Sequence, residues 1–392
     1  MKKILVLNGS PYEENIIRIF KELGLYVITS GNIPSFLGHK LANKYICHDY
    51  SDKPGMLNIA MENSIDYVCA CSNDFGVLTA AYIAESMRLP GHDTLETARI
   101  IAEKDHFKSF AQKNKLQVIP SQGFQDIDSA VSYAIDLSYP IIVKPVDLTG
   151  GKGVTKVKYP NQAEAAIRYG FERSRAKRIV IEPYIAGTQH SITTFLIDQK
   201  VVTYGSFNEG DANNAFLVGN SSSPADNENT AKDVLIPQIE KIAALLHLAD
   251  GIFHVQYRMD GEKPLIMECM RRILGNHALE SLEMSTGINW EYWEAMNYLG
   301  RDCRGIMDSP RQSIACSEYY IQAPSNGTVQ DVWISPALDK YIRKNYVQWH
   351  SGQFIKDYMT EKLCFLFLSF PDTETRRTIC QNINQYIHVV MN

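Results

Sequence analysis

The sequence predicts an α/β protein that begins with a doubly wound parallel sheet, and two observations carry this prediction. The run Ile4-Leu5-Val6-Leu7 is short and wholly apolar, as expected for a parallel strand that is buried on both faces. Residues 15–23 then place apolar side chains at helical spacing, and Gly24 supplies a helix stop. The alternation continues with strands expected at 26–29 and 66–71 and a helix expected at 75–87. Strands that alternate with helices in this way form parallel sheets covered on both faces.

The character of the chain changes after residue 100. A single helix is expected at 96–113, and an apolar strand at 139–145 leads into a glycine-rich turn at 147–154. Further elements are expected as a strand at 179–182, a helix at 235–248 and a hairpin of strands 253–258 and 264–270 that turns at Asp260-Gly261. Residues 207–231 are rich in Asn, Ser, Gly and Asp without periodicity, which predicts a long loop. Residues 305–392 are expected to form a third, mixed segment of strands and helices.

Composition and charge exclude several classes of function. At 392 residues the chain is long enough for two or three lobes. Its formal net charge of −5 argues against a phosphate-backbone partner, so we expect no nucleic acid partner. No apolar stretch reaches the roughly 18 residues that span a bilayer, and the N-terminal apolar run is too short for a secretory signal. We therefore expect a cytoplasmic protein without a membrane partner.

Two patterns that often mark a cofactor or a metal are absent. The eight cysteines include no Cys-x-x-Cys pair, which favours reduced, buried thiols over disulfides or a zinc site. The turn Asn8-Gly9-Ser10-Pro11 does not match G-x-G-x-x-G. A dinucleotide such as NAD is therefore not expected on the N-terminal sheet.

The glycine-rich turn is the first candidate for a phosphate site. Gly150, Gly151 and Gly153 let backbone N–H groups approach phosphate oxygens and tolerate positive φ. Lys144 stands at the end of the preceding strand, where its ammonium can reach the same phosphates. The Walker pattern is absent, because Lys152 is followed by Gly153 instead of Ser or Thr. A plain β-turn and a solvated strand end are the alternatives for these residues.

The hairpin at 253–270 is the second candidate. Because side chains alternate along a strand, the expected site face carries His254, Gln256 and Arg258 on one strand and Ile266, Glu268 and Met270 on the other. A carboxylate and an amide oxygen on facing strands suit Mg²⁺, which prefers hard oxygen ligands. A surface hairpin with its charges in water is the alternative.

The order of these constellations resembles that of the ATP-grasp superfamily. The resemblance is nearest to the carboxylate–amine ligase branch that contains the carbamoyl-phosphate synthetase large subunit and biotin carboxylase. Four segments carry it: Leu89-Pro90-Gly91 with Glu103-Lys104-Asp105, Pro140–Pro145 with Gly150–Gly153, Ile181–Gly187, and Gly251–Gln256 with Ile266–Arg272. They follow one another in the family's order and spacing over residues 1–300, and the match to 305–392 is looser.

The resemblance implies an α+β ATP-grasp fold in several parts. The expected parts are a pre-ATP-grasp domain at 1–100, an ATP-grasp domain at 101–304 with lobes of about 101–181 and 182–304, and a C-terminal lobe at 305–392. It also implies ATP and Mg²⁺ as cofactors, with Mn²⁺ as a substitute.

Roles for single residues follow from the same resemblance. For ATP, the implied residues are Lys104 and Lys144 at the phosphates, Thr149, Gly150, Gly151, Lys152, Gly153 and Val154 closing over them, Glu182, Pro183, Tyr184 and Ile185 at adenine, and Gln189 or His190 at the ribose. The Glu182 carboxylate would accept from the exocyclic amine of adenine. Gln256 and Glu268 would ligate the metal, and Arg272 would stabilise the transferring phosphoryl group, with Arg271 as the less favoured candidate.

One residue departs from the family pattern. Met270 stands where the family usually has Asn, two residues after the metal-binding Glu268, and a thioether is a poor ligand for Mg²⁺. Either Glu268 binds bidentately, or water and phosphate fill the gap, or Asn276 or His277 reaches the metal. A weakened or inactive enzyme is a further alternative.

The implied activity is that of a ligase that activates a small carboxylate as an acyl-phosphate and transfers it to an amine. The alternatives are a nucleotide-binding regulator that has lost turnover and a bicarbonate-activating enzyme of the carboxylase type. The segment 207–231 is the candidate lid over the substrate, and a homodimer is the default expectation for the assembly. The identity of the substrates does not follow from the sequence, and Glu318, Tyr319, Tyr320 and Arg343 cannot be assigned to a site.

Overall fold

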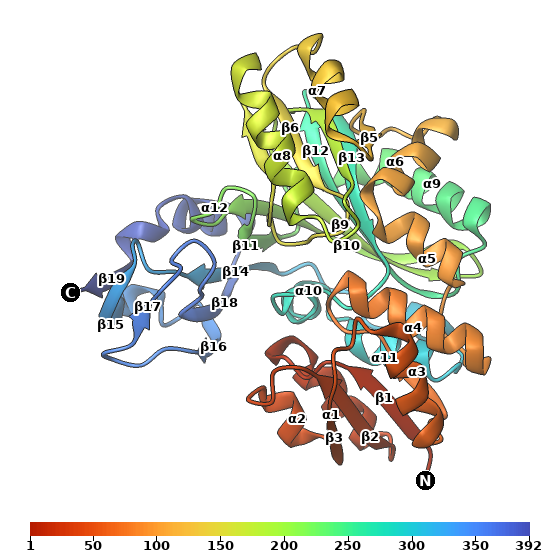
Figure 1. The fold of residues 1–392 in the computed structure, drawn as a ribbon. Helices are drawn as coiled ribbons and strands as arrows, with labels where there is room; N and C mark the ends of the chain where they lie inside the picture. The colour runs from red at the N-terminus through yellow and green to blue at the C-terminus, as the bar shows by residue number, and fades with distance from the viewer.

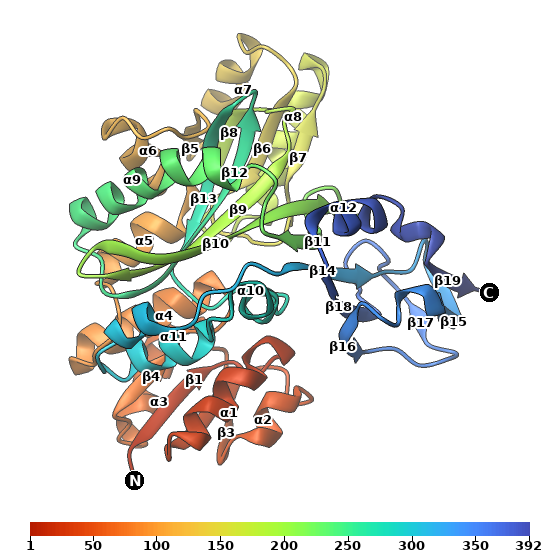
Figure 2. The ribbon, with the colours of Figure 1, turned by 180° about the vertical axis from the view of Figure 1, so that it is seen from behind.

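The computed structural model describes residues 1–392 and confirms the α/β fold class. Figure 1 shows a parallel sheet at the N-terminal end, a small lobe at the opposite end, and the C-terminal strands to one side. A large antiparallel sheet connects these parts, as the view from behind also shows (Figure 2).

The N-terminal sheet is parallel, as predicted. Its strands are β1 (Lys3–Leu7), β2 (Tyr26–Gly31), β3 (Lys44–Cys47) and β4 (Tyr67–Cys69), in the order β3-β2-β1-β4. Its helices are α1 (Glu14–Glu22), α2 (Leu37–Leu41), α3 (Lys53–Glu62) and α4 (Asp74–Met87). Residues Ile4 to Leu7 are wholly buried, which explains why this strand is apolar on both faces.

The small lobe at the top of Figure 1 is a four-stranded sheet covered by two helices. Its strands are β5 (Gln122–Phe124), β6 (Ile141–Pro145), β7 (Thr155–Val157) and β8 (Ile179–Pro183), and its helices are α7 (Ile127–Ile135) and α8 (Ala163–Arg173). The order β5-β8-β6-β7 places the ends of β6 and β8 side by side. The glycine-rich turn lies between β6 and β7.

The large sheet has eight strands in the order β13-β12-β9-β10-β11-β14-β18-β16. Their bounds are β9 (Gln189–Ile197), β10 (Lys200–Asp211), β11 (Val218–Ser223), β12 (Gly251–Asp260), β13 (Lys263–Met270), β14 (Ala315–Ile321), β16 (Ile342–Val347) and β18 (Cys364–Phe370). A three-stranded sheet of β15 (Gly327–Ile334), β17 (Phe354–Ile355) and β19 (Ile387–Met391) completes the C-terminal part. The remaining helices are α9 (Glu228–Leu246), α10 (Ala278–Thr286), α11 (Trp290–Tyr298) and α12 (Thr373–Gln381).

Two features cross the domain boundaries proposed from the sequence. The large sheet continues through residue 304, since β11 pairs with β14. Trp290 and Ala295 of α11 belong to the same buried core as Ile16 and Ile17 of α1. The division at 100 and 304 therefore stays a proposal, and the C-terminal part is joined to the centre through a continuous sheet.

The single helix expected at 96–113 is wrong, because it breaks at Glu103. Two helices form instead, α5 (Leu95–Ala102) and α6 (Lys104–Lys113), and Glu103 between them is extended, with φ −91° and ψ 117°. At the break the backbone N–H of Lys104 donates to the carbonyl oxygen of Val146 at 3.2 Å. A contact with a distant strand end thus overrides the helical periodicity and fixes the backbone that carries Lys104.

The long loop expected at 207–231 is also wrong. Strand β10 runs to Asp211, β11 occupies Val218–Ser223, and α9 begins at Glu228. The small polar residues of β11 lie between two neighbouring strands in the middle of the sheet, where pairing outweighs their low intrinsic β-propensity. Only the hairpin tip at 212–217 and the short turn at 224–227 are irregular.

The hairpin of β12 and β13 forms with the expected turn, but one side chain lies on the opposite face of the sheet from the one expected. Gln256 pairs with Glu268, whereas the next residue, Tyr257, pairs with Ile266, so Met267 is an extra residue in a β-bulge. The bulge turns Ile266 into the core beside Tyr257, on the opposite face from Glu268. Ile266 therefore does not share the face of Glu268 and Met270, contrary to the prediction.

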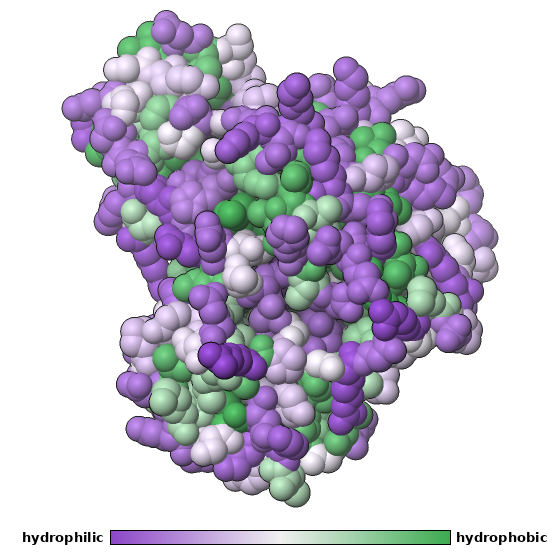
Figure 3. Space-filling model, turned by 90° about the vertical axis from the view of Figure 1, so that its right-hand side faces the viewer, coloured by the Kyte–Doolittle hydropathy of each residue, from purple (hydrophilic) through white to green (hydrophobic).

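The cysteines lie mostly as expected. Six of the eight are buried, whereas Cys47 is exposed and Cys380 is half-buried. No helix in the structure has the length and apolar character that crossing a membrane requires. Figure 3 shows the face that carries α4, α5 and α9, on which apolar side chains form small patches separated by polar ones.

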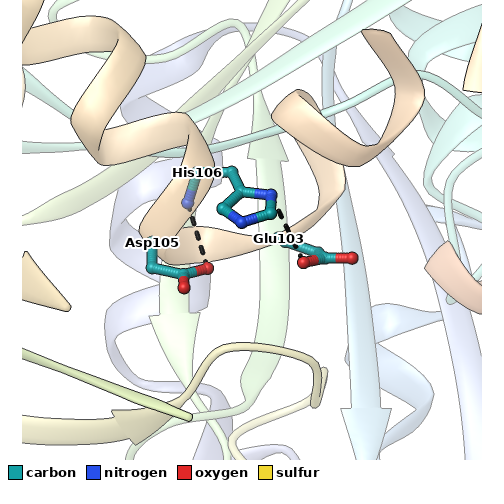
Figure 4. A group of neighbouring side chains, drawn as sticks. All are labelled: Glu103, Asp105 and His106. Atoms are coloured by element: carbon teal, nitrogen blue, oxygen red, sulfur yellow. Dashed lines mark hydrogen bonds and ion pairs between the residues drawn. The ribbon is translucent and has the colours of Figure 1, made fainter. Parts of the chain in front are cut away.

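A cluster of charged side chains stabilises the break between α5 and α6. Glu103, Asp105 and His106 converge there (Figure 4), and the guanidinium of Arg178, just before β8, binds the carboxylates of Glu103 and Asp105. The Arg178–Asp105 distance is 2.6 Å. Burial raises the pKa of Glu103, but the Arg178 guanidinium outweighs it and holds that pKa below its ordinary value. Because an arginine already neutralises these groups, we assign them a structural role.

We expect Arg178→Met to lower the free energy of unfolding by about 2 kcal/mol at neutral pH, because two carboxylates then face each other without a cation. The Glu103 pKa is depressed in the folded state, so its contribution is present above about pH 4.3 and is lost as the pH falls through the folded value. The variant should therefore lose less stability than the parent on acidification, as measured by denaturant titration at neutral and acidic pH.

The exposed pair Arg168–Glu164 provides a matched control. Arg168→Met should change the free energy of unfolding by no more than about 0.5 kcal/mol. Equal unfolding midpoints for the Arg178 variant and the parent protein would contradict the structural role of the cluster.

Candidate active site

A cavity of about 680 Å³ lies where the three parts of the chain meet. Its walls come from the carboxyl ends of the N-terminal strands, from β6 and β8 of the small lobe, and from β10, β12 and β13 of the large sheet. All but three of the residues predicted for the site line this cavity, and the exceptions are Arg271, Gly153 and His190. Residues predicted from separate segments are thus brought together at one place.

Lys144 and Glu182 form a buried ion pair on one wall. The Lys144 Nζ lies 2.6 Å from the Glu182 Oε1, and both side chains are almost wholly buried. Ser121 Oγ donates to the other carboxylate oxygen at 2.9 Å, and Lys108 Nζ lies 3.7 Å from it. Burial raises the pKa of Glu182, but Lys144 and Lys108 outweigh it, and the pKa lies below its ordinary value. Glu182 therefore already has donors in the protein, which differs from the expected role of accepting from adenine.

Lys108 is a buried lysine that the sequence reasoning missed. Its Nζ donates to the carbonyl oxygens of Ile119 and Ile266, and burial lowers its pKa to about 8. It does not line the cavity. Its place behind Glu182 makes it a support for the Lys144–Glu182 pair.

Glu268 and Gln256 stand opposite each other on β13 and β12, as predicted. Lys104 reaches the same place from the start of α6: its Nζ lies 3.5 Å from Glu268 Oε2 and donates to the Leu148 carbonyl oxygen at 2.8 Å. Burial raises the pKa of Glu268, but Lys104, Lys144 and Arg272 outweigh it, so the pKa is lowered. The carboxylate is therefore ionised at neutral pH and faces the cavity.

Glu209 is a further carboxylate of this group that the sequence reasoning missed. It lies on β10 and accepts hydrogen bonds from Gln256 Nε2 at 2.9 Å and from Gln189 Nε2 at 2.8 Å. Burial raises its pKa, and the nearby charge of Glu268 acts in the same direction. The sequence pattern conceals this residue, because 207–231 lacks periodicity and predicts a loop. A strand assignment would have placed it beside β9 and thus on the wall that carries Gln189.

Arg272 lines the cavity next to Met270, the residue that departs from the family pattern. Its Nε donates to Asp74 Oδ1 at 2.5 Å, and its Nη2 lies 3.2 Å from the sulfur of Met270. Asn276 also lines the cavity, but its side-chain oxygen accepts from Lys362. His277 lies outside it and stacks on Tyr346. Of the two residues considered as replacements for the usual Asn, only Asn276 is therefore within reach of the cavity.

Two predicted site residues point away from the cavity. Arg271 binds Asp93 at 2.9 Å and donates to the carbonyl oxygens of Ala249, Asp250 and Ile252, because successive residues after the strand point in opposite directions. His190 stacks on Tyr257 on the core face of the sheet. Their placement corrects the expectation that Arg271 is catalytic and that His190 faces the ribose. Gln189, the alternative to His190, does line the cavity.

The glycine-rich turn and the tip of the β10–β11 hairpin touch each other. A Cβ atom on Gly151, whose φ is +68°, would come within 2.8 Å of Phe216, so this position requires glycine for both conformation and space. Gly153 has φ +75° and packs against Pro145, which explains why it does not line the cavity. Ala215, Phe216 and Leu217 line the cavity beside the turn. The predicted lid segment thus reaches the cavity, although through a hairpin tip.

Parts of this sequence are similar to known proteins. Residues 102–272 match the family model of the phosphoribosylglycinamide synthetase ATP-grasp (A) domain. The phosphoribosylamine–glycine ligase of Methanopyrus kandleri is 25% identical over 218 residues, which cover 52% of this chain and 47% of the relative. The N-terminal section of the carbamoyl phosphate synthase large chain from the same organism is 27% identical over 94 residues, 24% of this chain and 17% of the relative. The match spans less than half the length of these two relatives.

A solved structure with the same fold covers the whole chain. The L-amino acid ligase from Bacillus licheniformis superposes with a TM-score of 0.83 at 20% sequence identity, covering 100% of this chain and 99% of that one. The segment matched by the family model contains α6, the glycine-rich turn and the β12–β13 hairpin, which are the elements that build the cavity. Residues 102–272 are therefore similar to an ATP-grasp domain, and the whole chain shares its fold with the L-amino acid ligase.

Proposed function

We propose that the protein is an ATP- and Mg²⁺-dependent ligase that activates a carboxylate as an acyl-phosphate and joins it to an amine. The observation that carries this proposal is the convergence of Lys104, Lys144 and the glycine-rich turn with Glu268 and Gln256 on one cavity. The matched relatives are ligases by name, and both phosphoribosylamine–glycine ligase and the L-amino acid ligase are named for an amine-bearing substrate.

The donor set fits ATP and a divalent cation. Lys104, at the start of α6, and Lys144, on the strand before the glycine-rich turn, are buried cations beside that turn. Such a pairing suits phosphate oxygens. Glu268, Gln256 and Glu209 offer two carboxylates and an amide oxygen on three strands of one sheet, which are hard ligands of the kind Mg²⁺ prefers. Bound there, the cation would neutralise charge on the transferring phosphate. Glu209 would supply an oxygen ligand that Met270 does not.

The first chemical step is phosphoryl transfer. A carboxylate oxygen attacks the γ-phosphorus, the bond to the β-phosphate oxygen breaks, and ADP leaves. The chain contributes alignment and positive charge: Lys104 and Lys144 hold the phosphates, and Arg272, oriented by Asp74, faces the transferring group.

In the second step the amine nitrogen attacks the acyl carbon, inorganic phosphate leaves, and the nitrogen loses a proton. The hairpin tip at 215–217 lies against the glycine-rich turn, and closure of these two segments would keep water from the acyl-phosphate.

Met270 supports a second candidate, a nucleotide-binding regulator without turnover, and bicarbonate activation is a third. One assay separates the three functions. ADP released only with a carboxylate and an amine together supports the ligase, bicarbonate-stimulated release without an amine supports the carboxylase type, and nucleotide binding without any release supports the regulator. We also propose a cytoplasmic location and a homodimer, the first because the eight free thiols suit a reducing compartment.

Lys144→Met should weaken ATP binding by about tenfold to hundredfold, because a hydrogen bond to a charged group contributes about 1.5–3 kcal/mol. Isothermal calorimetry with ATP and Mg²⁺ measures this. Because the substitution leaves Glu182 without its nearest cation, the double variant Lys144→Met, Glu182→Gln restores the local charge balance and should bind as weakly as the single variant. Lys158→Met, outside the cavity, is the control; unchanged ATP affinity in the double variant would contradict the assignment.

Glu268→Gln should reduce the rate of ADP formation by at least about hundredfold and raise the Mg²⁺ concentration for half-maximal rate, because it removes a charged ligand from the metal site. Glu209→Gln should raise the Mg²⁺ requirement by about tenfold with a smaller loss of maximal rate. Magnesium titrations of the ADP-forming reaction check both. A Glu209 variant with the parent's Mg²⁺ dependence would show that this carboxylate is not a ligand.

Met270→Asn should lower the Mg²⁺ concentration for half-maximal ADP formation severalfold, because an amide oxygen replaces a soft thioether at the position where the family carries Asn. The same titration measures it, with Met267→Asn, on the neighbouring bulge, as the control. If the parent protein forms no ADP and the Asn variant does, the regulator is the better description of the natural chain.

A further inference from the structure

Glu318 is a buried carboxyl group without a hydrogen-bond partner. Its residue is wholly buried in β14, and neither of its side-chain oxygens makes a hydrogen bond of ordinary geometry, although the Tyr320 hydroxyl lies nearby. It forms no ion pair with any lysine, arginine or histidine closer than 4 Å. Buried polar groups are nearly always paired, and a buried carboxylate without a partner is costly. Such a group therefore calls for a partner that arrives with a ligand.

The side chain of Glu318 lies on the cavity face of the large sheet. Glu318 pairs directly with Ser221 on β11 and therefore shares a face with it, and Ser221 lines the cavity. Tyr320, two residues along the same strand, also lines the cavity. Ala315 and Ile321 of β14, at odd positions, belong to the core on the opposite face. Because side chains alternate along the strand, Glu318 points to the cavity side of the sheet. In the sheet order β14 is four strands away from β12, so Glu318 lies at the far end of the cavity from the β12–β13 hairpin.

The groups around Glu318 are mainly aromatic, and the charged groups that act on it are Lys362 and the carboxylate of Glu280. Tyr12 and Tyr320 line this end of the cavity, and the Tyr320 hydroxyl lies 3.4 Å from the Asn276 carbonyl oxygen. Lys362 is the nearest cation, and its Nζ donates to the Asn276 side-chain oxygen and lies 4.0 Å from the centre of the Tyr320 ring. Burial raises the pKa of Glu318 and lowers the pKa of Lys362 to about 8. The protein itself therefore leaves the carboxyl group without a close counter-charge.

We propose that Glu318 is the counter-charge for a protonated amino group of the substrate, and that the compartment between Tyr12 and Tyr320 selects compounds with a primary ammonium group. A primary ammonium carries three donors, which suit two free carboxylate oxygens, and aromatic rings on either side favour a cation by cation–π attraction. This inference rests on the proposed ligase function and narrows its substrates to amino-group-bearing compounds such as amino acids.

The test uses pairs of probes that differ only in one amino group: glycine with acetate, β-alanine with propionate, and L-lysine with L-norleucine. Each is measured with the full chain, ATP, Mg²⁺ and hydroxylamine as an amine common to both members of a pair, both by ADP release and by the shift in melting temperature on binding. In the parent protein the amino member of at least one pair should have a kcat/KM about tenfold to hundredfold higher, the range for a hydrogen bond to a charged group.

Glu318→Gln, which keeps the shape of the side chain and removes its charge, should abolish this preference by raising the KM of the amino member, while the other member and ATP bind as before. Glu283→Gln, on α10 outside the cavity, should keep the preference. A Glu318 variant with the parent's preference, or a parent protein with no preference in any pair, overturns the proposal. If Glu318→Gln does not fold, Tyr12→Leu, which removes one aromatic ring of the compartment, should reduce the preference, and an unchanged preference in that variant overturns the proposal.

The two hypotheses fail differently. If no probe stimulates ADP release but amino members alone raise the melting temperature, the ligase function is wrong and the ammonium site stands. If ADP is released without preference for the amino members, the ligase stands and the role of Glu318 is wrong.

Discussion

Charge balance inside a buried cavity is the constraint on which the rest of this structure depends. Lys104, Lys144 and Glu182 are ionisable groups largely removed from water, Glu268 is half-buried, and each of the four is held by a partner of opposite charge. Without those partners the burial of any one of them would cost several kcal/mol. The pairs therefore force β6, β8, β13 and the start of α6 to meet at one place. A site that is charged before any ligand binds needs little rearrangement to hold a polyphosphate, and this preorganisation links stability to the proposed function.

The same convergence explains how strands far apart in the sequence share one site. Pairing of β12 with β9 and of β9 with β10 brings Gln256, Gln189 and Glu209 onto one face of the sheet. The bulge at Met267 keeps Glu268 on that face, opposite Gln256, while it turns Ile266 into the core. Continuation of the sheet into β14 then adds Glu318 to the same face. One sheet thus carries both the proposed metal ligands and the proposed ammonium site. Met270 is the last residue of β13, and Arg272 follows it.

The sequence predicted well those elements in which local pattern and burial agree. The parallel N-terminal strands, the β6 strand with its glycine-rich turn, and the β12–β13 hairpin have strong apolar runs or turn residues of their own. It failed where a distant contact overrides the pattern. The break at Glu103 depends on the bond from Lys104 to Val146 and on Arg178, and the strand at 218–223 depends on two neighbours that supply its hydrogen bonds. Arg271 and Arg272 are adjacent and chemically alike, so only the direction of the chain after β13 distinguishes them.

By itself, the sequence determined the order of the elements, the glycine positions that need positive φ, and the pairing of an amide with a carboxylate across a tight hairpin, because these follow from periodicity and short-range geometry. Only the tertiary structure decided which polar groups share a cavity, which of two arginines faces it, that Glu209 stands on its wall, and that Glu318 lies on the same face of the sheet. The physical reason is that burial and pairing of charge depend on strands that meet only after folding, and the neighbours of a residue along the chain do not record which strand will lie beside it.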